Sequence, residues 1–261
     1  MLSNEPISRR TFARQTLGSL LTYTLLETLF ERGAFADGNR LSGRSVRPLA
    51  TEWLGDVNEL ARQVQNQTLR HVEWQEKIEE LFARVDLPEL LRFIDFEKLT
   101  ADVPLSDKGA RSISFKFPKV EGMPSELVFG KQIFALKKGR SVVPHGHNNM
   151  ATAFLILKGN LRGRHYDRLE DVDDAFIIRP TIDREFAPGE CSTVSDYKDN
   201  IHWFEAITEP AYIFNIHVYH VSPGFGLPTG RVYVDPNGEK LAGGLIRAPR
   251  ISYQKANQLY G

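Results

Sequence analysis

The chain has 261 residues, of which 41% are hydrophobic and 25% are charged. These proportions are typical of a globular protein and exclude disordered and collagen-like classes. Lys plus Arg equals Asp plus Glu at 33 each, so no net charge attracts a polyanion and we expect no nucleic-acid partner. Cys191 is the only cysteine, which excludes an intramolecular disulfide and a cysteine-based metal cage.

The N-terminal residues predict an export signal. Residues 8–14 read SRRTFAR, which resembles the twin-arginine signal, and a mostly apolar stretch follows over residues 16–30. Residues 34–36, Ala-Phe-Ala, place small side chains on both sides of a larger one, which is the pattern that a signal peptidase accepts. We therefore expect residues 1–36 to be a signal peptide and the mature protein to be periplasmic or extracellular, with no membrane association. The alternative is an amphipathic helix, which Glu27 in the apolar run favours and which would leave the protein cytoplasmic.

Residues 37–105 are predicted to be a lead-in followed by a helical extension. Residues 37–50 are rich in Gly, Ser, Asn and Arg without apolar periodicity, which indicates a flexible lead-in. Over residues 52–84, apolar side chains recur at steps of three and four among charged ones, which predicts helix. Pro88 is expected to open a further short helix over residues 89–96.

Beyond residue 110 the pattern changes to short β-prone runs separated by turn residues. Such spacing favours an all-β barrel or sandwich, which we place at residues 106–261 together with a C-terminal tail. The runs cover residues 112–117, 127–136, 153–157, 175–178, 191–194, 212–221 and 231–234.

Two segments carry candidate metal ligands. In the first, Gly139 precedes His145-Gly146-His147, and Gly159 closes the segment. Two histidines one residue apart in a strand point to the same face, so both imidazoles can reach one ion. In the second, Pro188-Gly189 leads through a strand and a loop to His202.

Together these segments resemble the two cupin signatures, over about residues 110–222. The resemblance implies a mainly β fold, a cupin (jelly-roll-like) β-barrel with an N-terminal helical extension. It also implies one divalent metal held by His145, His147 and His202. Cupin barrels often pair through their sheets, so a homodimer is expected by analogy.

One position departs from the common cupin pattern. Where that pattern has a glutamate ligand, this sequence has Thr152. The expected ligand set is therefore three neutral histidines, which leave the metal's double positive charge uncompensated. Such a site favours an anionic substrate group, a thiolate or carboxylate. It also leaves coordination positions open, a setting in which iron(II) activates dioxygen.

The segments around these histidines also resemble the three-histidine thiol dioxygenases: cysteine dioxygenase, cysteamine dioxygenase and the plant cysteine oxidases. The similarity runs through residues 144–161, through Tyr166-Asp167 and through residues 200–208. It implies Fe(II) as the metal and Asp167 as a catalytic carboxylate near the substrate amine or bound oxygen. The implied reaction oxidises a small, cysteine-like thiol to a sulfinate with O2.

Two other functions stay open at this point. One is a zinc, manganese or nickel cupin that acts as an isomerase, hydrolase or lyase on a non-sulfur metabolite, with the metal as Lewis acid. The other is a non-catalytic binding cupin. Asp167 also has an alternative role, as an ion-pair partner only.

Strand alternation makes predictions for side chains near the site. On the strand after Gly159, Arg162, Arg164 and Tyr166 should share one face, with His165 and Asp167 on the other. His217 and His220 lack the cupin register and are expected to be structural. Because they differ by three, they should face opposite sides of their strand.

Overall fold

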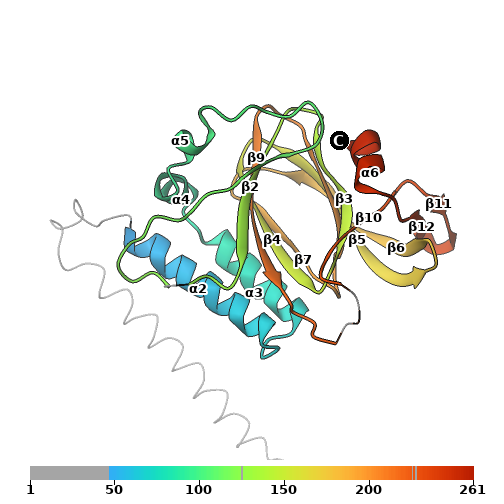
Figure 1. Cartoon of the computed structure of the whole chain (residues 1–261), viewed down its shortest axis with the longest axis horizontal. Coiled ribbons are helices and arrows are strands. Elements are labelled where there is room, and N and C mark those ends of the chain that lie inside the picture. Colours follow the sequence, from blue (N-terminus) through green and yellow to red (C-terminus); the bar gives the residue numbers. More distant parts are fainter. Residues whose placement is uncertain (1–46, 125, 225, 227) are drawn as a thin grey trace, which may run out of the picture. The chain divides into compact units, whose positions relative to one another are not determined.

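The computed structural model describes residues 47–124, 126–224, 226 and 228–261 (Figure 1). The predicted signal peptide lies outside the described residues, as does most of the lead-in. None of the described helices is long and apolar enough to cross a membrane. The helices are α2 (Arg47–Gln65), α3 (His71–Ala83), α4 (Leu87–Phe93), α5 (Phe96–Thr100) and α6 (Tyr253–Tyr260), with a 3-10 turn η1 (Ala242–Gly244).

Most of the described chain beyond residue 110 forms β-strands. They are β1 (Arg111–Ile113), β2 (Gly130–Leu136), β3 (Ser141–Asn148), β4 (Met150–Lys158), β5 (Leu161–Val172), β6 (Ala175–Phe186), β7 (Cys191–Val194), β8 (Ile201–Ala206), β9 (Ala211–Tyr219), β10 (Gly230–Tyr233), β11 (Glu239–Lys240) and β12 (Ile246–Pro249).

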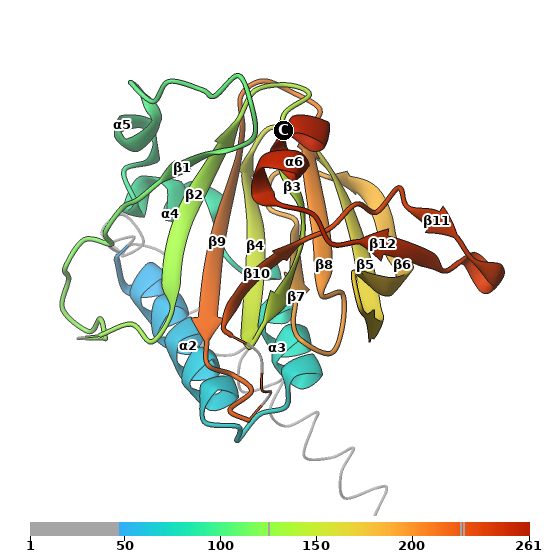
Figure 2. The same cartoon turned by 45° about the vertical axis from the view of Figure 1, so that its right-hand side comes forward.

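The strand pairing is nested. β2 pairs with β9, β3 with β8, β4 with β7 and β5 with β6, all antiparallel. A long hairpin folded over on itself gives this pattern, which is the jelly-roll topology. It produces a five-stranded sheet, β1-β2-β9-β4-β7, and a seven-stranded sheet, β10-β3-β8-β5-β6-β12-β11 (Figure 2). The predicted mainly β, cupin-like barrel with an N-terminal helical extension is confirmed.

The helical extension covers the five-stranded sheet. The predicted helix over residues 52–84 is two helices, because Gln67 adopts a left-handed φ of 60° and the chain turns before α3. α2 lies alongside β9, and α3 lies alongside β4 and β7 (Figures 1 and 2). The rings of Trp53 and Phe82 pack on Phe214 of β9, with centroids 6.4 and 6.5 Å away. Large buried apolar side chains thus attach the extension to the barrel.

The short predicted helix begins and ends earlier than expected. Asp86 caps α4 by accepting a hydrogen bond from the Glu89 N–H at 3.0 Å, so the helix begins at Leu87 rather than at Glu89. Asp95 has a left-handed φ of 53° and separates α4 from α5. The predicted single helix over residues 89–96 therefore ends at Phe93.

Several predicted strands differ in extent from those of the structure, and two of them show why. The run at residues 175–178 continues to Phe186, because the second half of β6 pairs with β5 from Arg162↔Glu185 to Tyr166↔Pro180. Its side chains are largely exposed, so no apolar pattern indicates it. The run at residues 112–117 is a strand only over Arg111–Ile113.

Gly159, predicted to close the first signature, turns the chain from β4 to β5. Its φ is +74°, and an added Cβ would lie 2.7 Å from both the Pro210 carbonyl oxygen and Thr208 Oγ1. A side chain here would meet backbone that cannot move aside, so glycine is required. The turn places His165 on a strand next to the one that carries His202.

The barrel interior contains an apolar cluster drawn from both sheets, which we call the apolar half. Its buried members are Phe134, Leu136, Val142, Phe154, Ile156, Leu161, Phe186, Val194, Phe204, Ala206, Ala211 and Ile213. The predicted C-terminal tail extends the seven-stranded sheet, where β10 pairs with β3 and β12 with β6. The remaining interior, next to β10, is where the histidines gather.

Candidate metal centre

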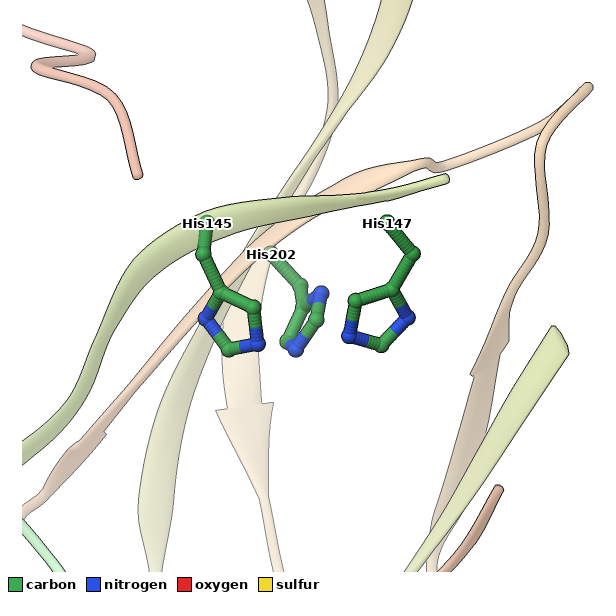
Figure 3. A group of neighbouring side chains, drawn as sticks. All are labelled: His145, His147 and His202. Atoms are coloured by element: carbon green, nitrogen blue, oxygen red, sulfur yellow. The ribbon is translucent and has the colours of Figure 1, made fainter. Parts of the chain in front are cut away.

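The three predicted ligands come together inside the barrel. His145 and His147 are two residues apart on β3, so their side chains point to the same face. His145 lies directly opposite His202 of β8. Their ring centroids are 4.2 Å apart for His145 and His202, 5.0 Å for His147 and His202, and 5.1 Å for His145 and His147. One ring nitrogen of each lies within 4.8 Å of the others, and Figure 3 shows the rings turned toward a common point.

Gly146, between the two histidines of β3, permits a close approach of two segments. An added Cβ would lie 2.6 Å from Asn200 Oδ1 and 3.0 Å from Ile201 Cγ1. Asn200 in turn donates its side-chain amide to the His147 carbonyl oxygen at 2.9 Å. The glycine therefore allows β3 to pack tightly beside the start of β8, which brings His202 to its partners.

Hydrogen bonds at Nδ1 leave Nε2 available for a metal. His145 Nδ1 lies 2.8 Å from the Val143 carbonyl oxygen, which can only accept, so this nitrogen carries the proton. His147 Nδ1 lies 3.2 Å from Thr152 Oγ1. His147 Nε2 is buried and has no hydrogen-bond partner among the described residues. A metal-binding histidine usually donates its other N–H in this way.

Burial keeps the three imidazoles neutral. His145, His147 and His202 are 4%, 0% and 1% exposed. Burial lowers the pKa of His145 to about 3 and the pKa values of His147 and His202 well below the ordinary value, and the positive charge of Arg231 acts in the same direction. Their lone pairs are therefore free to bind a divalent cation at neutral pH.

No carboxylate joins this cluster within the described part of the chain. Thr152, at the position of the common cupin glutamate, instead has its Oγ1 3.2 Å from His147 Nδ1 and 3.0 Å from His217 Nδ1. The Gln132 amide nitrogen lies 3.0 Å from His217 Nε2 and donates to it, so His217 carries its proton on Nδ1. The Thr152 oxygen has two lone pairs and accepts from both imidazoles. Thr152 thus orients His147, and the three neutral histidines lie together without a carboxylate, as expected.

His217 is a residue that the sequence patterns missed as part of this region. It is buried, and its ring centroid is 6.1 Å from that of His147. It reaches the site because Thr152 of β4 lies opposite His217 of β9. His220 is exposed and lies beyond the end of β9 with a left-handed φ of 60°, so it is not on the strand and the prediction that the two histidines face opposite sides of one strand is wrong.

Side chains on β5 alternate as predicted. Arg162 and Arg164 form ion pairs with Asp183 on the outer face, at 2.7 and 3.7 Å. His165 faces the interior and is 0% exposed. Asp167 accepts hydrogen bonds from Arg179 Nη2 at 2.7 Å and from the Asp199 N–H at 2.9 Å. The structure thus provides Asp167 with an ion-pair partner, and its catalytic role stays a prediction.

A cation also lies beside the cluster. On β10, Arg231 is opposite His147 and Tyr233 is opposite His145, so both side chains share the inner face with the histidines. Among the described residues, the Arg231 side chain has no hydrogen-bond or ion-pair partner. A cavity of about 80 Å³ is lined by His145, Arg231, Tyr233 and Tyr253, among others. Of the three clustered histidines, His145 is the one that lines this cavity.

No family model matches this sequence, and no curated protein matches it. Among solved structures, a cupin superfamily protein from Desulfitobacterium hafniense is similar with a TM-score of 0.30 and 14% identity, over 45% of this chain and 84% of that one. Oxalate oxidase in complex with glycolate has a TM-score of 0.34 and 14% identity, over 49% and 56% of the two chains.

Procruciferin, an 11S globulin from Brassica napus, has a TM-score of 0.30 and 11% identity, over 36% of this chain and 21% of that one. The chain therefore spans less than two thirds of the length of procruciferin and of oxalate oxidase. The fold assignment rests on the nested strand pairing of this chain itself. Inside that cupin-like barrel lies a buried three-histidine cluster whose neutral nitrogens fit a metal ion.

Proposed function

We propose that the protein is a metal-dependent oxidoreductase that uses O2 to oxidise a small, cysteine-like thiol to a sulfinate. Fe(II) would be held by His145, His147 and His202. The observation that carries this proposal is the buried ligand set of three neutral imidazoles without a carboxylate. The similarity of the surrounding sequence to three-histidine thiol dioxygenases supports the reaction type.

The residues fit a divalent metal in their donor chemistry. Two of the rings have their Nδ1 proton fixed by Val143 and Thr152, and His147 Nε2 is a buried atom that lacks any other partner among the described residues. When bound, iron would supply the redox chemistry by which RSH and O2 combine to RSO2H, with both oxygen atoms transferred to sulfur.

The chain's own charges favour an anionic substrate. Three neutral ligands leave the metal's charge uncompensated, and Arg231 adds a positive charge on the same inner face. A thiolate that carries a second anionic group would satisfy both. Phe154, whose ring centroid is 4.9 Å from that of His202, provides an apolar wall that limits water. Asp167 remains our candidate for holding the substrate amine.

Elemental analysis of protein purified without added metal, followed by oxygen uptake, tests the proposal. We expect about one iron per chain, one ion for one cluster of three ligands. We also expect oxygen uptake with at least one of cysteine, cysteamine, 3-mercaptopropionate and a peptide with N-terminal cysteine, and sulfinate as the product. Iron-loaded protein that is inactive with all four thiols would overturn it. Zinc, manganese or nickel in place of iron would favour a Lewis-acid reaction on a non-sulfur metabolite.

We also propose that residues 1–36 direct export by the twin-arginine route and that the mature protein is a homodimer. Replacing Arg9 and Arg10 by lysine in the full chain should retain the protein in the cytoplasm. Light scattering of the purified protein gives its oligomeric state. Unchanged export of the lysine variant, or a monomer at all concentrations, would contradict the respective proposal.

A further inference from the structure

A row of inward-facing side chains crosses the seven-stranded sheet. Cross-strand pairing places Tyr233 opposite His145, His145 opposite His202, and His202 opposite His165. Directly opposed residues in a sheet share a face. His165 therefore faces the same interior as the three ligands, one strand further along, and its ring centroid is 6.3 Å from that of His202. Its ring nitrogens are not among the converging ligand atoms.

His165 is buried without any partner for its polar atoms. It is 0% exposed, and within the described chain neither Nδ1 nor Nε2 has a hydrogen-bond partner. Its ring neighbours besides His202 are Phe204 and Phe186, with centroids 5.5 and 6.3 Å away. A neutral imidazole carries one N–H donor and one lone pair, and burying both unpaired destabilises the folded protein.

Stability alone therefore favours a different residue at this position. Leucine has about the size of histidine, carries no polar atom and would suit the phenylalanine neighbours. Buried polar groups in folded proteins nearly always have a partner, and an exception next to a candidate site indicates that the partner is a bound molecule. A residue that reduces stability and is needed for activity is a recognised trade-off.

We propose that His165 is a positioning residue of the site, which hydrogen-bonds a polar group of the substrate other than its sulfur. The proposal rests on the proposed function in that the molecule is held at the three-histidine site. In this role His165 orients the bound molecule and does not coordinate the metal.

Two variants separate this role from a packing role. In His165→Leu the metal-free protein should unfold at a higher urea concentration than wild type, because two unpaired polar atoms are removed. Its metal content should be unchanged, and kcat/KM should fall about 10- to 100-fold, the range for one lost hydrogen bond to a charged or polar group. His165→Gln keeps a donor and an acceptor and should recover part of kcat/KM. The matched control Phe204→Leu, on the same inner face, should unfold at a lower urea concentration.

A spectroscopic measurement keeps the test independent of turnover. Cysteine is titrated into cobalt(II)-substituted protein, and its Kd is read from the visible spectrum. We expect His165→Leu to raise that Kd about tenfold or more and His165→Gln to raise it less. If wild-type protein oxidises no thiol, the proposed function fails, while the urea and cobalt measurements still decide the role of His165. A lower urea midpoint for His165→Leu, or a Kd and kcat/KM equal to wild type, would overturn the proposal.

Discussion

The interior of the barrel has two halves of opposite character. The apolar half contains side chains such as Phe154, Phe186 and Phe204, whose rings pack edge-on or tilted at 5.0 to 5.9 Å. The other half contains five buried histidines: His145, His147, His165, His202 and His217. Both halves are equally removed from water, yet four ring nitrogens of the histidine half lack partners among the described residues.

The apolar half stabilises the fold, whereas the histidine half reduces stability and forms the candidate site. A fully buried phenylalanine contributes about 1.5–3 kcal/mol through the area it removes from water. An unpaired buried imidazole nitrogen instead lowers the free energy of unfolding, since it loses its hydrogen bonds to water when the protein folds. Several such atoms gathered on one inner surface are explained by a metal and its ligands rather than by packing.

The largest expected effect is loss of the metal on replacing a ligand. His202→Ala removes one of three donors, and because a site with only three protein ligands needs all of them to hold the metal, we expect no stoichiometric metal after purification and no oxygen uptake. Elemental analysis measures this. His220→Ala is the matched control, because His220 is exposed and outside the cluster; it should retain metal. Equal metal content in both variants would contradict the ligand assignment.

The apolar half should respond in stability and not in metal chemistry. Phe204→Ala leaves a cavity at a side chain that is 0% exposed, and we expect the free energy of unfolding to fall by about 3–5 kcal/mol. Urea unfolding of the metal-free protein measures this. The fraction that remains folded should still bind metal in the same ratio. Loss of metal without loss of stability would mean that the two halves are not separate.

The sequence predicts the clustering of the three histidines well, because two of them are specified locally. His145 and His147 are one residue apart in a strand, and the spacing of Gly139, Gly159 and Pro188 relative to them is characteristic of one barrel. The jelly-roll topology follows from recognising that pattern. The sequence pattern could not predict the distances that are set by pairing between segments far apart in the chain.

His217 illustrates this limit. It meets Thr152 only through the register of β4 on β9, which are separated by more than fifty residues of sequence. All residues of β9 from Ala211 to Val218 are buried, so alternation carries no signal of inside and outside. Similarly, the inward direction of His165 depends on β5 lying beside β8, with a register shift after His165 in its pairing with β6.

A smaller effect is expected at the residue that orients His147. Thr152→Val keeps the shape of the side chain and removes the hydroxyl that both His147 and His217 contact. Loss of such an orienting hydrogen bond lowers metal affinity by about 10- to 100-fold. Competition with a metal chelator gives the affinity. Thr152→Ser, which retains the hydroxyl, should stay near wild type, and equal weakening in both variants would indicate a packing effect.

Arg231 should affect substrate recognition and leave the metal in place. Arg231→Gln removes the positive charge opposite His147, so we expect KM for thiols that carry a carboxylate to rise about tenfold, with kcat little changed. Cysteamine, which has no carboxylate, should show a much smaller change. Arg162→Gln on the outer face is the control. An equal rise in KM for cysteine and cysteamine would show that the charge does not select the anion.

The smallest effect is expected outside both halves, at the turn between β6 and β7. The Ala187 N–H donates to Glu190 at 2.7 Å and Arg184 donates to it at 2.6 Å; these bonds lower the pKa of the Glu190 carboxyl. A carboxyl whose pKa is lowered by folding stabilises the protein at pH values above its pKa in the unfolded state. That contribution is lost as the pH falls through its pKa in the folded state. Because the side chain is 43% exposed, Glu190→Gln should cost less than about 1 kcal/mol at pH 7. Urea midpoints of the two proteins should converge below about pH 4, and a gap that persists there would assign the effect to the turn's geometry rather than to the charge.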